Sequence, residues 1–148
     1  MKTIEKSIDV NVPVRTAYNQ WTQFEEFPRF LEGVEEVRQL DDTLLHWRAN
    51  IGGKSLEWNA RIIEQVPDNR IAWQSEGGPM HNGMVSFHPI GAESARVTLR
   101  MDYEPEGLLQ ETGDKLGFVS RQVEEDLERF KQFIESRGVE TGAWRGAV

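Results

Sequence analysis

Cysteine is absent from the sequence, which excludes disulfide bonds, thiol catalysis and zinc–thiolate sites together. Long hydrophobic runs are absent as well, because no apolar stretch approaches the roughly 20 residues that a membrane-spanning helix requires. The first twelve residues alternate between apolar and polar side chains, a pattern that predicts a strand and not a signal peptide. Asn-x-Ser/Thr sites for N-glycosylation are also missing. We therefore expect a cytoplasmic protein without a membrane span.

Positive charge is scarce in this chain. It has 17 Lys and Arg residues against 25 Asp and Glu residues, a formal net charge of −8 and an isoelectric point near 4.9. Such a surface repels phosphate backbones and anionic lipid headgroups, so we expect no nucleic-acid partner. With 148 residues, of which 38% are hydrophobic and 28% charged, the chain fits one globular domain with a sizeable core.

Motifs for catalysis or cofactor binding are nearly absent. The sequence GGKS at 52–55 resembles the end of a phosphate-binding loop, but Arg48 stands where that motif requires a glycine, and a hairpin is expected there instead of a helix. His46 and His88 have the outward parity of their predicted strands, and only His81 has inward parity. A lone inward histidine is a poor metal site. We therefore expect no metal and no cofactor.

The stretch WTQFEEFPRFLEGVEEV, at 21–37, concentrates aromatic side chains. Four of them follow one another at steps of three: Trp21, Phe24, Phe27 and Phe30. This spacing places them on one stripe of a helix. Pro28 disfavours a helical residue before it, so we expect two short helical pieces that break at Pro28 and end at Gly33. The stripe is either plain core or the wall of a pocket.

The hydrophobic periodicity divides the rest of the chain into strands and one long helix. Period-two segments separated by turn sequences predict seven strands, the last six joined as an antiparallel meander. They span 4–12, 34–40, 43–51, 54–66, 70–75, 81–90 and 95–103. Apolar residues at steps of three and four predict an amphipathic helix over 116–137. We expect an α+β fold, with one domain at 1–137 and a flexible tail at 138–148.

The inner face of the predicted sheet mixes very large and very small side chains. A twisted sheet of this size curls, and the long helix is the only predicted element that can cover its concave face. Strand alternation places three tryptophans on that face among small residues: Trp47, Trp58 and Trp73 with Ala49, Ala60, Ser75 and Gly83. Large beside small side chains either interlock as ordinary core or leave a void for a ligand. Taken with the fold, the set favours a pocket.

Several segments together resemble the START-like (SRPBCC) superfamily, in its polyketide cyclase/dehydrase and coenzyme Q-binding branch. They are W-x-x-F-x-x-F-P-x-F at 21–30 with EGVEEVRQLD after it, LEWNARIIEQVPDNRIAW at 56–73, NGMVSFHPI at 82–90, RVTLRMDYEPEG at 96–107, and RQVEEDLERFKQFIE in the last helix. The resemblance covers residues 1–137. It implies a helix-grip fold, in which a curved seven-stranded antiparallel sheet wraps a long C-terminal helix around a hydrophobic cavity, with two short helices after the first strand.

Members of this superfamily bind sterols, lipids, quinones, plant hormones or polyketides, and a minority catalyse reactions. The resemblance therefore implies an apolar or amphipathic small molecule, such as a lipid, quinone or polyketide, held between sheet and helix. In this family the short helices lie beside the cavity, which adds two phenylalanines to the inward strand residues. The expected ligand-binding residues are Phe27, Phe30, Trp47, Ala49, Trp58, Ala60, Trp73, Ser75, His81, Val85, Phe87, Leu99, Met101 and Tyr103.

Three functions are open for such a cavity. We favour binding, transport or presentation of the ligand without catalysis, for which no catalytic residue is expected. A polyketide cyclase or dehydratase is the alternative, and it would use His81, Tyr103 or Glu64 as acid–base groups. A non-catalytic accessory protein for a quinone is the third.

Overall fold

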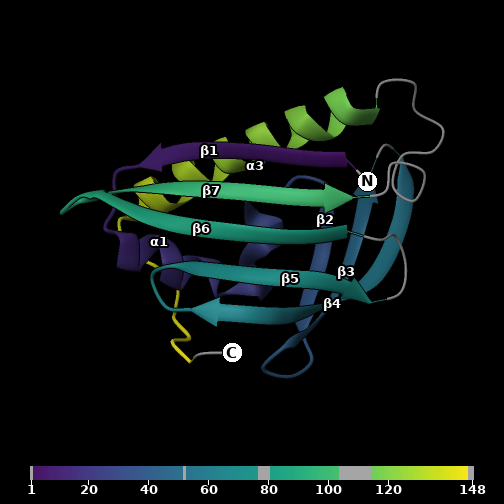
Figure 1. The fold of residues 1–148 in the computed structure, drawn as a ribbon, viewed down its shortest axis with the longest axis horizontal. Coiled ribbons are helices and arrows are strands. Elements are labelled where there is room, and N and C mark those ends of the chain that lie inside the picture. The colour runs from purple at the N-terminus through teal and green to yellow at the C-terminus, as the bar shows by residue number, and fades with distance from the viewer. Residues whose placement is uncertain (1, 52, 77–80, 104–114, 147–148) are drawn as a thin grey trace.

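A computed structural model describes residues 2–51, 53–76, 81–103 and 115–146 (Figure 1). The strands are β1 (Lys2–Val10), β2 (Val34–Gln39), β3 (Leu44–Ile51), β4 (Lys54–Val66), β5 (Arg70–Glu76), β6 (His81–Gly91) and β7 (Ser94–Tyr103). The helices are α1 (Val14–Trp21), the 3-10 helix η1 (Phe24–Arg29) and α3 (Lys115–Arg137). The predicted order of strand, two short helices, six strands and a long helix is confirmed.

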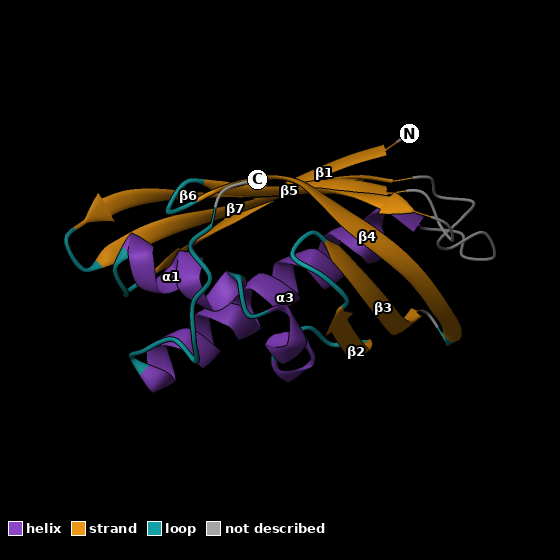
Figure 2. Cartoon of the chain, turned by 90° about the horizontal axis from the view of Figure 1, so that it is seen from below, coloured by secondary structure: helices purple, strands orange, loops and turns teal. Residues whose placement is uncertain are grey.

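The seven strands form one antiparallel sheet in the order β1-β7-β6-β5-β4-β3-β2. The last six strands are joined in sequence order, as the short turns between them predicted. Only β1 is out of sequence, because it pairs with β7 at the far edge. Figure 2 shows the sheet curving over the described helices, which lie on one of its faces. This is the helix-grip arrangement.

The long helix α3 supplies the apolar face that closes the core. Its buried side chains recur at steps of three and four: Val123, Leu127, Phe130 and Ile134. The ring of Phe130 packs 4.9 Å from the ring of Trp21 and 5.2 Å from that of Phe30. These contacts join the helix to the aromatic stripe, and the predicted stripe of α3 is confirmed over these residues.

The aromatic stripe follows the geometry of a 3-10 helix. Such a helix has three residues per turn, so side chains three apart stand one above the other. Phe24, Phe27 and Phe30 have this spacing in and just after η1, and their successive ring centroids are 5.4 and 5.5 Å apart. The break falls at residues 22–23 and not at Pro28, which lies inside η1. Proline is tolerated there because the short 3-10 helix has few hydrogen bonds to lose.

A β-bulge in β4 changes which side chains face inward. Ile62 pairs with Trp73 and Glu64 pairs with Ala72, so Ile63 is an extra residue on β4. Ile63 therefore points outward, with 55% of its surface exposed. Beyond the bulge the parity is shifted by one residue, and Gln65 is buried while Glu64 is not.

Residues 139–146, which we call the C-terminal strap, return along α1 (Figure 1). The Gln20 side chain accepts a hydrogen bond from the Thr141 backbone at 2.9 Å and donates one to the Thr141 hydroxyl at 3.0 Å. Arg145 donates to Asn19 Oδ1 at 2.7 Å and pairs with Asp68 at 2.8 Å. These contacts explain why polar side chains of α1 are buried. The sequence predicted a flexible tail at 138–148, and that prediction did not anticipate these contacts with α1.

Candidate functional site

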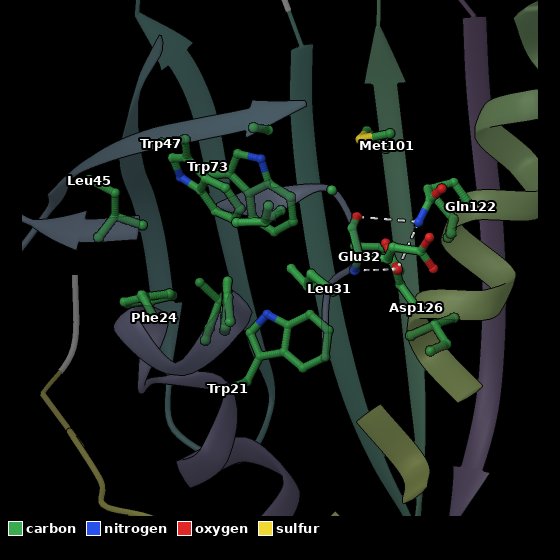
Figure 3. A pocket seen from close by; sticks show the side chains of 18 of the residues that line it. Trp21, Phe24, Leu31, Glu32, Leu45, Trp47, Trp73, Met101, Gln122 and Asp126 are labelled. Atoms are coloured by element: carbon green, nitrogen blue, oxygen red, sulfur yellow. Dashed lines mark hydrogen bonds between the residues drawn. The ribbon is translucent and has the colours of Figure 1, made fainter. Parts of the chain in front are cut away.

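A cavity of about 190 Å³ lies between the sheet, the short helices α1 and η1, and α3 (Figure 3). Its described walls come from α1, η1, the strands β2, β3, β4, β5 and β7, and α3, so residues far apart in sequence surround it. The described residues that line it are Trp21, Phe24, Phe27, Leu31, Glu32, Gly33, Val34, Leu45, Trp47, Ala49, Trp58, Ile62, Ile71, Trp73, Leu99, Met101, Gln122, Val123, Asp126 and Leu127. The wall is apolar except at three of these residues.

One wall is a pair of stacked indoles. Trp47 and Trp58 are direct cross-strand partners on β3 and β4, so their side chains leave the same face side by side. Their ring centroids are 5.9 Å apart and their planes are nearly parallel, at 8°. The ring of Phe27 meets Trp47 at 5.6 Å, which connects η1 to this wall. Ala49 lies beside the pair and contributes only a methyl group, so the cavity extends there.

A second wall is made by Trp73 lying over a glycine. Trp73 on β5 pairs with Gly83 on β6, and a Cβ atom at Gly83 would stand 2.1 Å from Trp73 Cζ2. No side chain can share that space. The indole therefore lies against the sheet because Gly83 has no side chain, and here the large and small residues interlock instead of leaving a void.

The polar groups of the cavity gather where the loop between η1 and β2 meets α3. Asp126 Oδ1 accepts hydrogen bonds from the Glu32 backbone at 3.2 Å and from Gln122 Nε2 at 3.0 Å. Gln122 also donates to the Glu32 carbonyl at 3.4 Å. In Figure 3 these groups form a connected triangle, on the opposite side of the view from Trp47 and Trp73.

Arg129 completes this polar cluster from the next turn of α3. Its Nη2 donates to Asp126 Oδ1, its Nε donates to the Phe30 carbonyl at 3.2 Å, and its Nη1 lies 3.1 Å from Glu32 Oε2. Burial nevertheless raises the pKa of Asp126 above the ordinary value, because desolvation outweighs the hydrogen bonds from Arg129 and Gln122. Asp126 is thus a partly desolvated carboxylate at the edge of an apolar space.

Half of the predicted ligand-binding residues line the cavity, and the structure places five of the others elsewhere. Those in the wall are Phe27, Trp47, Ala49, Trp58, Trp73, Leu99 and Met101. Phe30, Ala60, Val85 and Phe87 are buried in the packed interior instead, and Ser75 pairs with Ala60 beyond the cavity. The side chains of His81 and Tyr103 lie outside the described residues.

Glu64, a candidate acid–base residue, does not reach the cavity. The bulge in β4 turns it outward, where Arg70 Nε and Nη2 donate to its two oxygens at 2.6 and 3.0 Å. These hydrogen bonds lower the pKa of Glu64. A carboxylate held ionised by a surface arginine is poorly suited to give or take a proton inside the cavity.

The sequence-based reasoning missed the contribution of α3 and of the η1–β2 loop to the cavity. Val123 and Leu127 belong to the predicted helix stripe, so the stripe itself was the available signal. Gln122 and Asp126 stand one residue before them at a spacing of four, which places both on one edge of that stripe. Nothing in the local pattern indicates that the Glu32 backbone meets them.

Within the described ranges, no three His, Asp or Glu side chains gather closely enough to hold a metal ion. The described helices include none that is both long and apolar enough to cross a bilayer.

The curved sheet, the long helix and the apolar cavity between them together define a helix-grip fold. The family model for polyketide cyclase/dehydrase and lipid transport proteins matches residues 10–132. The chain therefore belongs to this family. A Streptomyces lincolnensis relative, a 17.2 kDa protein in the melC2-rnhH intergenic region, is 54% identical over 149 residues, covering 100% of this chain and 99% of the relative.

Solved structures share the fold at low sequence identity. The Zhui aromatase/cyclase from Streptomyces sp. R1128 superposes with a TM-score of 0.79 at 16% identity, covering 97% of this chain and 99% of its own. A START superfamily protein from Mycobacterium smegmatis superposes with a TM-score of 0.72 at 18% identity, covering 91% of this chain and 95% of its own. At such identities the similarity concerns the fold alone.

Proposed function

We propose that this protein binds an apolar or amphipathic small molecule in the cavity and carries or presents it without changing it. The observation that supports this most directly is the wall, in which Trp47, Trp58 and Trp73 meet aliphatic side chains around a space of about 190 Å³. A concave apolar wall favours an apolar ligand, because binding removes the surfaces of both from water. Flat indole faces favour a ligand with planar unsaturated rings.

The family description names polyketide cyclases and dehydrases as well as lipid transport, so catalysis is the second candidate. Cyclisation with loss of water needs groups that move protons at the ligand. Among the described residues of the wall, only Glu32 and Asp126 carry an ionisable side chain. His81 and Tyr103 remain candidates from the sequence. A wall with so few ionisable groups fits binding better than proton transfer.

Blocking the cavity tests the binding proposal. Trp58→Arg places an unpaired charge in an apolar wall, so the protein should lose affinity for a neutral aromatic probe such as 2-methoxynaphthalene, measured by isothermal titration calorimetry. Ile63→Arg is the matched control, since it adds the same charge to the outward face of the same strand. Ala49→Leu is a second variant that fills part of the cavity without adding charge. Unchanged affinity in folded Trp58→Arg and Ala49→Leu proteins would refute binding at this site.

A second measurement separates a binding protein from an enzyme. His81→Ala and Tyr103→Phe should change ligand affinity by no more than a lost hydrogen bond, about 0.5–1.5 kcal/mol. An acid–base residue would instead lower turnover of a polyketide substrate by roughly 10²–10⁴-fold while binding survives. A loss of that size at either position would favour the cyclase. Mass spectrometry of natively purified protein would identify a ligand that co-purifies.

A further inference from the structure

We propose that Asp126 makes the cavity selective for neutral ligands that carry a hydroxyl group, and that the carboxylate accepts the hydrogen bond of this hydroxyl through Oδ2. This inference rests on the proposed binding function and specifies the ligand class. Several polar atoms of the cluster already have hydrogen-bond partners within the protein, whereas one oxygen of Asp126 has none among the described residues.

The two oxygens of Asp126 have different surroundings. Oδ1 accepts three hydrogen bonds, from the Glu32 backbone, Gln122 and Arg129. Oδ2 has no hydrogen-bond partner among the described residues, although Asp126 lines the cavity and keeps 16% of its side-chain surface accessible. Three donors therefore fix the orientation of the carboxylate through one oxygen and leave the other oxygen as an acceptor for a ligand.

The charges around Asp126 disfavour a ligand with an anionic group. Glu32, the other acidic residue of the lining, has a largely exposed side chain, and no described residue of the lining is a lysine, arginine or histidine. Arg129 is the neighbouring cation, and its Nε, Nη1 and Nη2 are engaged by the Phe30 carbonyl, Glu32 and Asp126. An incoming carboxylate or phosphate would have to displace these partners and be desolvated beside the like charge of Asp126.

A neutral hydroxyl avoids both costs. An O–H group that donates to a carboxylate forms a short, charge-assisted hydrogen bond, stronger than one between neutral groups. A ligand ammonium would also be a donor, but a charged group loses far more hydration free energy than a hydroxyl when it enters an apolar space. The rings of the ligand would then lie toward Trp47 and Trp58, across the cavity from the polar cluster.

The test compares three probes that share one ring system: 2-naphthol, which has a hydroxyl; 2-methoxynaphthalene, which lacks the donor; and 2-naphthoate, which is an anion. Calorimetric titration of the wild type and of Asp126→Asn gives the ratio of the naphthol to the methoxynaphthalene affinity in each protein. Because the difference in hydrophobicity between the probes is common to both titrations, a change in this ratio reports the carboxylate. Glu128→Gln is the control, since it removes one negative charge from an exposed position on the same helix.

A hydrogen bond to a charged group contributes enough that the ratio should fall about tenfold or more in Asp126→Asn and stay unchanged in Glu128→Gln. The affinity for 2-naphthoate, the weakest probe for the wild type, should rise in Asp126→Asn. A second measurement needs no variant: the carboxyl carbon resonance of Asp126 in the wild type should shift with 2-naphthol and not with 2-methoxynaphthalene.

Two results would contradict this selectivity. If Asp126→Asn leaves the ratio unchanged, or if the Asp126 resonance responds equally to both neutral probes, the carboxylate does not recognise a hydroxyl, while binding in the cavity stands. If none of the three probes binds to the wild type, the proposed binding function fails and this inference fails with it.

Discussion

Gly83 is the position where a single methyl group should disturb the cavity most directly. Its backbone φ is not in the left-handed region, so alanine meets no backbone strain there. The added Cβ would stand 2.1, 2.5 and 2.8 Å from three ring atoms of Trp73, all closer than van der Waals contact allows. Because the indole is rigid, the whole ring must move. The sheet, including Gly83, lies under one face of the ring, so we expect the ring to move away from the sheet and into the cavity.

The size of the effect follows from two opposing contributions. Overpacking of a buried site costs typically 1–3 kcal/mol. A Gly→Ala change in unstrained backbone contributes about 0.4–1 kcal/mol of stability by restricting the unfolded chain. We therefore expect Gly83→Ala to lower the free energy of unfolding by about 1–2 kcal/mol, and to weaken binding of an aromatic probe as Trp73 enters the cavity.

Urea unfolding followed by circular dichroism would measure the stability, with Gly91→Ala as the control. Gly91 lies on the same strand, but the atom nearest to its added Cβ is the Ser94 hydroxyl, which can rotate away. The double variant Gly83→Ala/Trp73→Leu should be more stable than the sum of the single changes predicts, because the smaller side chain relieves the clash. A Gly83→Ala protein with wild-type stability and wild-type probe affinity would refute the contact between Trp73 and Gly83.

Two further predictions concern the surface ion pairs. Arg70 lowers the pKa of Glu64 in the folded protein, so this pair adds stability above the ordinary pKa of 4.5 and loses it as the pH falls through the folded pKa. The stability difference between wild type and Glu64→Gln should therefore vanish in acid. A difference that persists there would contradict the contribution of this ion pair. Arg145→Ala removes the strap's contacts with Asn19 and Asp68 and should lower the free energy of unfolding by about 1 kcal/mol. The control is Arg38→Ala, which removes an exposed ion pair and should change this free energy by less than about 0.5 kcal/mol. Equal effects of the two substitutions would show that the strap adds no stability.

The elements of this fold were predictable because their signals are local. Alternation of apolar and polar residues located all seven strands, and turn sequences such as Asp41-Asp42 gave their antiparallel connection. The same alternation placed Trp47 and Trp58 on the inner face, where the structure has them stacked. The mixture of large and small residues was harder to interpret, since Ala49 opens the cavity while Gly83 is covered by an indole.

The polar part of the site was not predictable because it depends on contacts between distant segments. Glu32 and Asp126 are 94 residues apart, and their contact involves a backbone N–H that no side-chain pattern reports. The strap is a similar case, since it docks by hydrogen bonds between Thr141 and Gln20, 121 residues apart, without hydrophobic periodicity. Sequence periodicity reports burial of apolar faces, whereas these contacts join polar groups that are distant in sequence.

The bulge in β4 shows how one extra residue decides which chemistry faces the cavity, and it gives a test of the register. Deleting Ile63 would make the pairs Ile62–Trp73 and Glu64–Ala72 consecutive, so every other side chain of β4 keeps its face. This variant should fold cooperatively, with a stability loss of about 1–3 kcal/mol for the local distortion.

Deleting Asn59 instead removes one residue from the regular part of β4. Whichever way the strand then shifts, either Trp58 or Ile62 is turned to the outer face, because a one-residue slip reverses the side-chain alternation. Both of these side chains are buried in the intact protein, with exposed fractions of 8% and 2%. We therefore expect this second variant to lose cooperative urea unfolding. Equal stability of the two deletion variants would show that the bulge does not set the register, and the outward position of Glu64 would then lose its explanation.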